Sequence, residues 1–568
     1  MLAFERSPML AELRQHPLDG DDPFDVLVVG GGITGAGVAL DAAHRGLRVA
    51  LVERDDFASG TSSKSSKLIH GGLRYLQNGD VRLVYEALHE RRRLMRNAPH
   101  MVEILPFLIP IMTKDGVISR KIAKALGSAL WMYDITGGWR IGKLHRRLSA
   151  DKAAMHFPST HLDRLSGGFL YYDATADDAR LTLTIARTAA EHGAVVVNRA
   201  RVVEIVHRDG RVAGAVVDAD GTSIGVAART IVNACGVWAD DIRALDEGAH
   251  PGSIRPAKGV HITLRWQLVG NDIAVIIPVR RDKRSLFLVP WGPLGDGTFR
   301  HVYVGTTDTD DHGSLDEPLA DGDDIDYLLE ALNQALDTSR RRPITRDDIT
   351  GTWAGLRPLV NVVVDHTGEH AGATKDLSRR HLVAVSAAGV VTVTGGKLTT
   401  YREMAADSVD ALRDLLPRGS MKHRSTRRLR LSGTPRASGR RDRASTDAPA
   451  DAHLARRYGS RADEVRALVA FDASLGDPLV VGLPYLRAEA VYAARHEMAT
   501  TLDDVLARRT RAHLLDRSAT LAAAADVAAL MQAELGWSDD ETARQVDHYA
   551  AMCAAEELAG DHVANATN

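Results

Sequence analysis

A short apolar run near the N-terminus leads directly into a cluster of glycines. Residues 25–29 read DVLVV, a β-branched run typical of a buried parallel strand. Residues 30–35 read GGGITG, and a stretch with helix composition follows until Gly46 ends it. A second apolar run, 48–52, stops at Glu53. The pattern predicts strand, turn, helix and strand, the order of a βαβ unit.

The glycines of this unit fit the G-x-G-x-x-G spacing of dinucleotide-binding proteins. Gly30 permits a tight turn, Gly32 lets the backbone approach a pyrophosphate, and Gly35 lets helix and strand pack closely. The helix N-terminus offers unpaired N–H groups to the phosphates. Glu53 is placed to accept hydrogen bonds from the adenosine ribose and would repel a 2′-phosphate, which disfavours NADP. The motif by itself does not distinguish FAD from NAD.

Strand and helix patterns divide the rest of the chain. Alternating apolar segments at 259–265, 274–279 and 286–290 predict strands of an antiparallel sheet. The alanine-rich C-terminal part predicts helices. We expect an N-terminal extension (1–23), a nucleotide-binding region (24–416) with a discontinuous dinucleotide domain (about 24–100, 165–245 and 350–416) and a capping domain between, a basic linker (417–450) and a helical C-terminal domain (451–568).

Residues 117–133 form a basic amphipathic helical pattern. The predicted apolar face comprises Ile118, Ile122, Leu126, Ala129, Leu130 and Tyr133, whereas Arg120, Lys121 and Lys124 lie largely elsewhere. Such a helix is typical of contact with a membrane interface, and equally of a helix that packs on its own domain. The basic stretch 417–450 predicts a solvated linker that an anionic lipid surface could use. It contains no aromatic residues among the basic ones, so nucleic acid is not expected as a partner.

Composition sets the remaining limits. A chain of 568 residues with 45% hydrophobic and 26% charged residues predicts two or three globular domains. The net charge of -3 gives no global attraction to nucleic acid or to an anionic membrane. Cys235 and Cys553 form no disulfide framework and no metal-ligand spacing, which suits a reducing cytoplasm. No secretory signal and no transmembrane run is present, so we expect any membrane contact to be peripheral.

After Glu53, a stretch rich in Ser and Gly ends in KLIHGGLRYL, residues 67–76. This string resembles the flavin-wrapping loop of the FAD-dependent (aerobic, respiratory) glycerol-3-phosphate dehydrogenases. Further matching strings follow in family order: TIVNACGVW (230–238), KGVH (258–261), PW (290–291), VGTTD (304–308), GLRPL (355–359), SRRH (378–381) and GGKLTTYR (395–402). The resemblance covers about residues 24–416 strongly and continues weakly at 489–511. One departure is Cys235, where many relatives have Thr; a buried small residue is the commoner role, and a reactive thiol the other.

The resemblance implies an α/β fold and FAD as the cofactor. The fold would be a Rossmann-like FAD-binding domain of the glutathione-reductase or D-amino-acid oxidase type, with an antiparallel substrate-domain sheet and a helical C-terminal domain. The residues expected at the cofactor are Gly30, Gly32, Ile33, Thr34, Gly35, Glu53, Arg54, Thr61, Ser62, Ser63, Lys67, Leu68, His70, Gly71, Gly72, Ala234, Gly236, Trp238, Gly355, Gly396, Lys397, Leu398 and Thr399.

The resemblance also implies a substrate and a set of residues that bind it. The expected reaction oxidises sn-glycerol 3-phosphate at C2 to dihydroxyacetone phosphate, with hydride transfer to flavin N5 and electron transfer to a membrane quinone. His70 is the candidate base, and Arg357 and Lys397 are expected near the reacting oxygen. The substrate-binding residues would be Arg379, which holds the phosphate, with Arg74, Tyr75 and Thr399.

Several alternatives stay open at this stage. Oxygen could reoxidise the flavin and give hydrogen peroxide, as in a glycerol-3-phosphate oxidase. The same fold could oxidise an amino acid or a 2-hydroxy acid, or bind a flavin without turnover. We expect a cytoplasmic protein, peripheral on the cytoplasmic membrane face. The oligomeric state is left open, a homodimer included.

Overall fold

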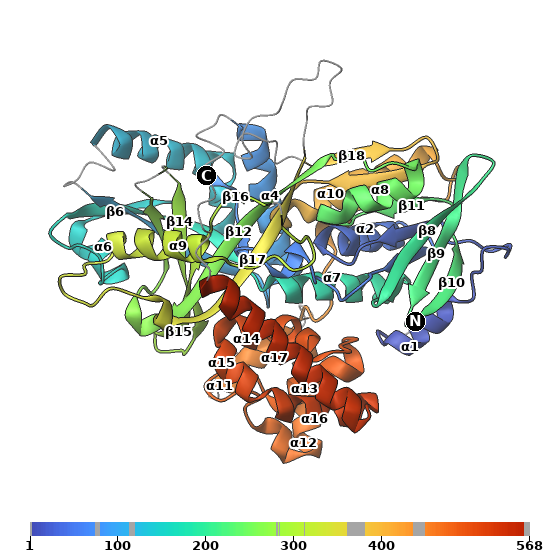
Figure 1. The fold of residues 1–568 in the computed structure, drawn as a ribbon. Helices are drawn as coiled ribbons and strands as arrows, with labels where there is room; N and C mark the ends of the chain where they lie inside the picture. The colour runs from blue at the N-terminus through green and yellow to red at the C-terminus, as the bar shows by residue number, and fades with distance from the viewer. Residues whose placement is uncertain are drawn as a thin grey trace, which may run out of the picture.

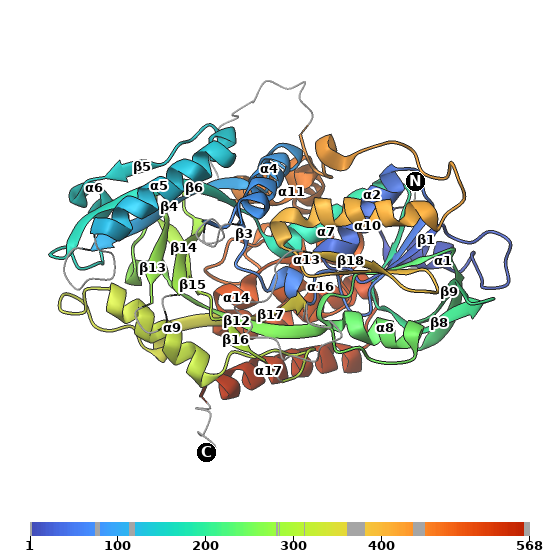
Figure 2. The ribbon, with the colours of Figure 1, turned by 90° about the horizontal axis from the view of Figure 1, so that it is seen from above.

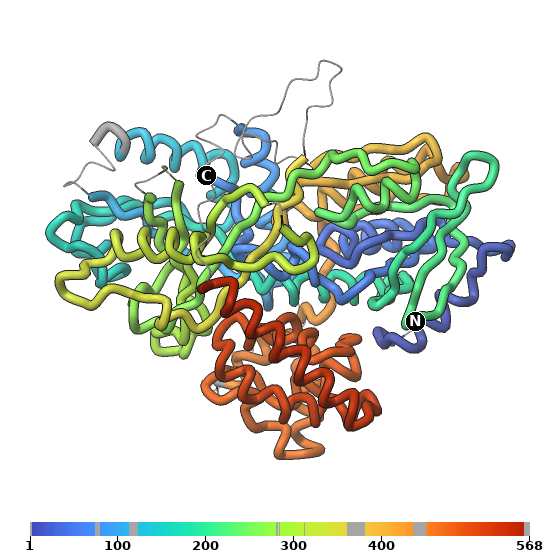
Figure 3. Tube along the Cα trace, viewed as in Figure 1, coloured from blue at the N-terminus to red at the C-terminus, as the bar shows by residue number. Residues whose placement is uncertain are grey.

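A computed structural model describes residues 3–73, 80–112, 120–279, 282, 284–311, 313–360, 381–435 and 449–561. Two sheets with their helices lie side by side, and the C-terminal helices form a third lobe against them (Figure 1). The Cα trace shows that the N-terminal segment lies on the lobe with the parallel sheet (Figure 3). The α/β fold class predicted from the sequence is confirmed.

The first sheet forms the dinucleotide domain. Its six strands run in the order β18-β19-β11-β1-β2-β7, and all neighbouring pairs are parallel except β18 with β19. Four of the strands, β1, β2, β7 and β11, are short runs rich in valine with every residue buried, as expected for a parallel sheet covered on both faces. The strands are β1 (Val26–Val29), β2 (Val49–Val52), β7 (Val195–Val197), β11 (Ile231–Asn233), β18 (Leu382–Val385) and β19 (Val390–Thr394).

Helices and a small sheet cover this domain. Helix α2 packs against both α7 and α10. A three-stranded antiparallel sheet, β10-β9-β8, lies at the side of the domain (Figure 1). The elements are α2 (Ile33–His44), α7 (Asp178–Glu191), α8 (Ala239–Glu247), α10 (Tyr401–Ala411), β8 (Ala200–Arg208), β9 (Arg211–Ala219) and β10 (Thr222–Ala227). Inside the predicted N-terminal extension, α1 (Arg6–Leu13) buries Met9, Leu10 and Leu13 in the same core.

The second sheet forms the substrate domain. Its strand order is β16-β12-β15-β14-β13-β4-β6-β3, with β17 paired to β12 and β5 paired to β6. All pairs are antiparallel except β13 with β4, so the predicted antiparallel sheet is confirmed. The strands are β3 (Leu68–Ile69), β4 (Glu103–Met112), β5 (Arg146–Leu148), β6 (Leu165–Thr175), β12 (Ile254–Arg265), β13 (Ala274–Pro278), β14 (Ser285–Pro293), β15 (Phe299–Gly305), β16 (Thr309–Asp310) and β17 (Ile349–Val360).

Helix α5 (Arg120–Thr136) lies along the outer side of this sheet, next to α4 (Val81–Asn97) (Figure 2). The apolar face predicted from the sequence packs inward: Leu130 and Tyr133 are buried, and Leu126 and Ala129 pack against the same core. Ile118 lies outside the described residues. The described part of this face is therefore used for packing within the domain rather than presented to a membrane. The helices α6 (Ala150–His156) and α9 (Gly322–Ala335) complete the domain.

The C-terminal lobe is helical, as the alanine-rich composition predicts. Its elements are α11 (Pro449–Tyr458), α12 (Ala462–Phe471), α13 (Arg487–His496), a π-helical turn (Asp504–Arg509), α14 (Ala512–Leu515), α15 (Arg517–Ala522), α16 (Ala524–Leu535) and α17 (Asp539–Asp561). The stretch 417–435, predicted as the start of a linker, is fixed to the dinucleotide domain. Thr426 donates a hydrogen bond to Asp41 (2.8 Å), and Leu431 is buried in the core. Residues 436–448 lie outside the described part.

Buried charges join the C-terminal lobe to the loop after β2. Asp56, fully buried, accepts hydrogen bonds from Arg508 (2.7 Å) and from both terminal nitrogens of Arg509 (2.7 Å each). Arg511 reaches the carbonyl oxygen of Ser63 (2.5 Å) and the carboxylate of Asp178 (2.6 Å). Because a buried charge without a partner is strongly destabilising, these contacts hold the loop and the lobe together.

This arrangement predicts the effect of neutralising one carboxylate. In the Asp56→Asn variant, Arg509 loses its carboxylate partner and Arg508 loses one of three, and removing one partner of a buried pair costs about 3–5 kcal/mol. We expect a lower melting temperature, measured by differential scanning calorimetry. The control is Glu541→Gln, whose partner Arg544 is exposed; its melting temperature should not change. An Asp56→Asn protein that melts with the wild type would contradict the account.

Candidate flavin and substrate site

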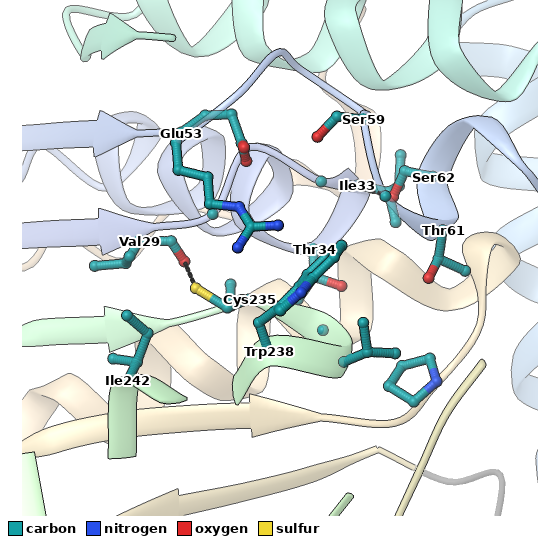
Figure 4. Close-up of a pocket in the computed structure, with 18 of the residues that line it drawn as sticks. Val29, Ile33, Thr34, Glu53, Ser59, Thr61, Ser62, Cys235, Trp238 and Ile242 are labelled. Atoms are coloured by element: carbon teal, nitrogen blue, oxygen red, sulfur yellow. Dashed lines mark hydrogen bonds between the residues drawn. The ribbon is translucent and has the colours of Figure 1, made fainter. Parts of the chain in front are cut away.

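A cavity of about 390 Å³ opens at the carboxyl edge of the parallel sheet. Strands β1, β2, β11 and β19 end here, and the residues that follow them directly line the cavity: Gly30, Glu53, Ala234 and Gly395. Parallel sheets of this kind bind their ligands at this edge. Figure 4 shows the lining side chains of Val29, Glu53, Thr61 and Trp238 around one space. Four segments far apart in the sequence therefore meet at one site.

The glycine turn has the shape that a pyrophosphate needs. Gly30 has a φ of +107°, and a Cβ atom there would lie 2.8 Å from the carbonyl oxygen of Ala234. A Cβ on Gly35 would lie 1.9 Å from the carbonyl oxygen of Gly30, so only glycine permits this packing of turn and helix. Helix α2 begins at Ile33, whose N–H donates to Ser62 Oγ (2.9 Å). The helix N-terminus thus lies at the cavity, which Gly32, Ile33 and Thr34 line.

Glu53 is held at the cavity by two backbone groups. Its Oε2 accepts from the N–H of Gly31 (2.6 Å) and its Oε1 accepts from the N–H of Asp55 (2.9 Å). Burial raises the pKa of Glu53 to about 7, and the two N–H groups act in the opposite direction. The carboxylate is therefore oriented for a ligand that donates hydrogen bonds, as ribose hydroxyls do.

Arg54 and Trp238 form one wall of the cavity. The guanidinium carbon of Arg54 lies 4.5 Å from the centroid of the Trp238 ring, a cation–π contact. Beside them, Cys235 donates from Sγ to the carbonyl oxygen of Val29 (3.3 Å), as Figure 4 shows. Burial raises the pKa of the Cys235 thiol far above its usual range. The thiol is half-buried and stays neutral, which agrees with the structural role rather than the reactive one.

Lys397 is presented by two glycines with left-handed backbone conformation. Gly395 has a φ of +73° and Gly396 a φ of +79°, and a Cβ on Gly396 would lie 2.4 Å from the sulfur of Met404. The turn follows β19 directly, and Lys397 and Leu398 line the cavity. The GGKLTT string thus places a cation at the carboxyl edge of the sheet.

The loop that carries His70 lies next to this turn. The N–H of His70 donates to Thr399 Oγ1 (3.1 Å), and Thr399 is buried. Upstream, the same loop crosses β17: a Cβ on Gly355 would lie 2.6 Å from the carbonyl oxygen of Lys64. Ser63 is buried in the loop, and β3, with Leu68, pairs with β6. Residues 63–70, within the described part of this loop, therefore lie against β17, β6 and the turn after β19.

Most of the residues expected at the cofactor line the cavity, and the others stay predictions. The lining residues are Gly30, Gly32, Ile33, Thr34, Glu53, Arg54, Thr61, Ser62, Ala234, Gly236, Trp238, Gly396, Lys397 and Leu398. The expected residues that are not among its lining residues are Gly35, Ser63, Lys67, Leu68, His70, Gly71, Gly72, Gly355 and Thr399.

The side chain of Lys67 points elsewhere. Its ammonium nitrogen lies 4.2 Å from the ring centroid of Trp353 and 5.5 Å from that of Trp291, and 3.7 Å from Asp178. Burial lowers the pKa of Lys67 to about 8, with Asp178 acting in the opposite direction. This position faces the substrate-domain sheet and the C-terminal lobe. The side chain of Lys67 is therefore not among the groups that line the cavity.

Arg357 is held by the turn after β15. Its guanidinium donates to Asp308 (2.9 Å), to Thr306 Oγ1 (3.2 Å) and to the carbonyl oxygen of Thr307 (3.1 Å). The next residue on β17, Pro358, lines the cavity, whereas Arg357 does not, because successive side chains of a strand point to opposite faces. Arg74, Tyr75 and Arg379 lie outside the described residues, and their predicted contacts with the substrate stay predictions.

The sequence analysis missed part of the cavity wall. Residues from the start of β8 and from α8 also line it: Ala200, Arg201, Val202, Val203, Asp241, Ile242 and Leu245. No short motif marks these positions. The only signal is their place after β7 and β11, where a parallel sheet presents its ligand-binding edge.

The first comparison defines the class of the protein. The family model described as "FAD dependent oxidoreductase" matches residues 25–402, and that described as "C-terminal domain of alpha-glycerophosphate oxidase" matches residues 424–542. The cradle of glycines, the oriented carboxylate and the elongated cavity fit FAD. The chain is an FAD-dependent oxidoreductase with FAD as its cofactor.

The second comparison gives the family. The chain is 41% identical over 549 residues to glycerol-3-phosphate dehydrogenase 2 of Mycobacterium tuberculosis, covering 95% of this chain and 89% of that one. It is 34% identical over 580 residues to the mitochondrial glycerol-3-phosphate dehydrogenase of Bos taurus, covering 96% and 76%. The structure of the glycerol-3-phosphate dehydrogenase from Bacillus halodurans with FAD superposes with a TM-score of 0.74 at 29% identity, covering 97% and 98%. The chain belongs to the FAD-dependent glycerol-3-phosphate dehydrogenase family.

The environment of Glu53 predicts how FAD binding depends on pH. Only the ionised carboxylate of Glu53 accepts hydrogen bonds from both ribose hydroxyls. Because burial raises the pKa of Glu53 to about 7, the carboxyl group is protonated below that pH and must lose its proton when FAD binds. We expect the affinity of the apoprotein for FAD to be full above this pKa and to fall by up to about tenfold per pH unit below it. Quenching of flavin fluorescence measures the affinity. The Glu53→Gln variant should bind more weakly and without this dependence; an equal slope in both proteins would refute the assignment.

Proposed function

We propose that this chain oxidises the C2 hydroxyl of sn-glycerol 3-phosphate to dihydroxyacetone phosphate and passes the electrons to a membrane quinone. The observation that carries the proposal is that Lys397 lines the FAD cavity on the turn whose Thr399 binds the backbone of His70. The choice of substrate rests on the relatives, which are named glycerol-3-phosphate dehydrogenases. An anionic substrate agrees with the ammonium group of Lys397 at the cavity.

Each of these residues has a chemical task in the proposal. Bound FAD supplies the hydride acceptor. His70 takes the proton of the C2 hydroxyl, because an imidazole accepts protons near neutral pH. Lys397 and Arg357 stabilise the negative charge that develops on the substrate oxygen. Asp308 keeps the guanidinium of Arg357 in place, and Thr399 fixes the backbone of His70.

An exposed apolar patch on α5 supports a membrane as the site of the electron acceptor. Trp131, Met132 and Ile135 are 56%, 47% and 73% exposed, on the side of the helix opposite to Leu130 and Tyr133. Trp139 and Leu144 follow and are also exposed, as are the basic residues Lys124, Lys143, Arg146 and Arg147. Aromatic and apolar groups with a basic rim are typical of a surface that enters an anionic lipid interface. None of the described helices is long and apolar enough to cross a bilayer.

A glycerol-3-phosphate oxidase is the second candidate. The match of residues 424–542 to the C-terminal domain of alpha-glycerophosphate oxidase favours it. The two functions share the flavin site and the substrate and differ in how the reduced flavin is reoxidised. The names of the full-length relatives favour the dehydrogenase.

One anaerobic experiment tests the substrate and then the acceptor. We expect sn-glycerol 3-phosphate to bleach the flavin absorbance of the purified protein, and a ubiquinone or menaquinone analogue to restore it. Glycerol and a 2-hydroxy acid serve as controls and should leave the flavin oxidised. A flavin that stays oxidised with sn-glycerol 3-phosphate would exclude the proposed substrate. Fast recovery in oxygen with stoichiometric hydrogen peroxide, and none with quinone, would favour the oxidase.

Vesicle binding tests the patch on α5. The double variant Trp131→Ser, Ile135→Ser removes two exposed apolar side chains, and we expect its affinity for anionic phospholipid vesicles to fall by about tenfold or more. The matched control is Phe471→Ser, Val481→Ser, which removes two exposed apolar groups from the C-terminal lobe. Both variants should keep the flavin. Equal vesicle binding by the two double variants would show that α5 is not the membrane surface.

A further inference from the structure

The turn that carries His70 is tied at two successive backbone nitrogens. The N–H of His70 donates to Thr399 Oγ1 (3.1 Å), on the segment that lines the FAD cavity. The next N–H, that of Gly71, donates to the hydroxyl of Tyr133 (3.0 Å) and, at a longer distance, to Asp173 Oδ1 (3.3 Å). Tyr133 belongs to α5 and Asp173 to β6, so the turn is held between the dinucleotide domain and the substrate domain.

Behind Gly71 lies a chain of buried polar groups. The hydroxyl of Tyr133 donates to the carboxylate of Asp173, with distances of 2.7 Å and 2.8 Å to its two oxygens. Asp173 also pairs with Arg91, which in turn donates to the carbonyl oxygen of Tyr172 (2.9 Å). Arg91, Tyr133 and Asp173 are each at most 1% exposed. Burial and the charge of Asp173 raise the pKa of Tyr133 well above its usual range, so its hydroxyl stays protonated.

Tyr133 packs so closely against the turn that there is no space for a side chain at position 71. A Cβ on Gly71 would lie 2.6 Å from the hydroxyl of Tyr133 and 2.6 Å from Leu88 Cδ2. Gly72, with a φ of +76°, then turns the chain away. The hydroxyl of Tyr133 therefore contacts the backbone of Gly71 directly and sets the distance of this backbone from α5.

Core stability does not account for this network. Buried ion pairs stabilise proteins little compared with apolar side chains of the same volume, because removing two charges from water offsets their attraction. The pair of Arg91 and Asp173 does, however, orient the hydroxyl of Tyr133 toward one backbone N–H, beside the proposed base. A buried polar network of this kind specifies one geometry.

We propose that Tyr133, oriented by Asp173 and Arg91, is a positioning residue that holds the His70 side chain in its reactive place at the flavin. The inference rests on the proposed function, in which His70 accepts the proton from the substrate. It assigns to α5 a role in the reaction although none of the helix's described side chains lines the cavity.

The Tyr133→Phe variant removes only the hydroxyl. We expect it to fold and to bind FAD, while the rate of flavin reduction at saturating substrate, per bound flavin, falls by about 10- to 100-fold, as misplacement of a reacting group by roughly 1 Å does. The KM should change far less than kcat, because the hydroxyl holds the base and not the substrate. The matched control is Tyr171→Phe, a buried neighbour whose ring stacks on Phe107 (5.1 Å); its rate should equal that of the wild type.

A second variant shows whether Tyr133 acts through His70. We expect His70→Asn to slow flavin reduction strongly, and the double variant His70→Asn, Tyr133→Phe to be no slower than His70→Asn alone. Losses that multiply in the double variant would overturn the proposal. So would a Tyr133→Phe protein with the reduction rate of the wild type.

Hydrogen exchange tests the tether without the reaction. The amide of Gly71 should exchange faster in Tyr133→Phe than in the wild type or in Tyr171→Phe, measured by mass spectrometry of the peptide that spans residues 68–73. Unchanged exchange would overturn the tether itself. If the wild-type flavin is not reduced by sn-glycerol 3-phosphate, the proposed function fails, and the exchange result still decides whether Tyr133 holds the turn.

Discussion

The structure of the active region depends on how the loop between Glu53 and Gly72 is held. Its polar groups are fixed from three directions: Arg508 and Arg509 from the C-terminal lobe, Thr399 from the turn after β19, and Tyr133 from the substrate domain. A loop of this composition, rich in Ser and Gly, has a large conformational entropy when free. Contacts from all three parts of the molecule restrict this loop, and the loop lines the FAD cavity. The cavity therefore has its shape only in the assembled fold.

The C-terminal lobe gains a physical role from this constraint. The pairs of Asp56 with Arg509 and of Asp178 with Arg511 are buried, and each joins residues more than 300 positions apart in the chain. Neither lobe could bury its half of these pairs alone, since an isolated buried charge is prohibitively unstable. The lobe contributes no lining residue to the cavity, and it acts by fixing the loop that does.

Helix α5 has two faces with different partners. On one side Leu130 and Tyr133 pack into the substrate domain, and the hydroxyl of Tyr133 reaches the turn of His70. On the other side Trp131, Met132 and Ile135 are exposed. The same helix thus connects the surface proposed for the membrane to the loop proposed for catalysis.

The sequence by itself determined the local elements and the class of site. Runs of valine next to glycines, and Glu53 after a strand, predict the βαβ unit and a dinucleotide as its ligand. They do so because the backbone conformation there depends on residues close in the chain. The tertiary structure decided everything that requires distant partners. Lys67 turned toward Trp353 and Asp178, Arg357 paired with Asp308, and the apolar face of α5 packed inward. Several partners of similar chemistry are available to each of these side chains, and burial and geometry in the folded protein determine which one it contacts. The spacing of residues along the chain does not contain this information.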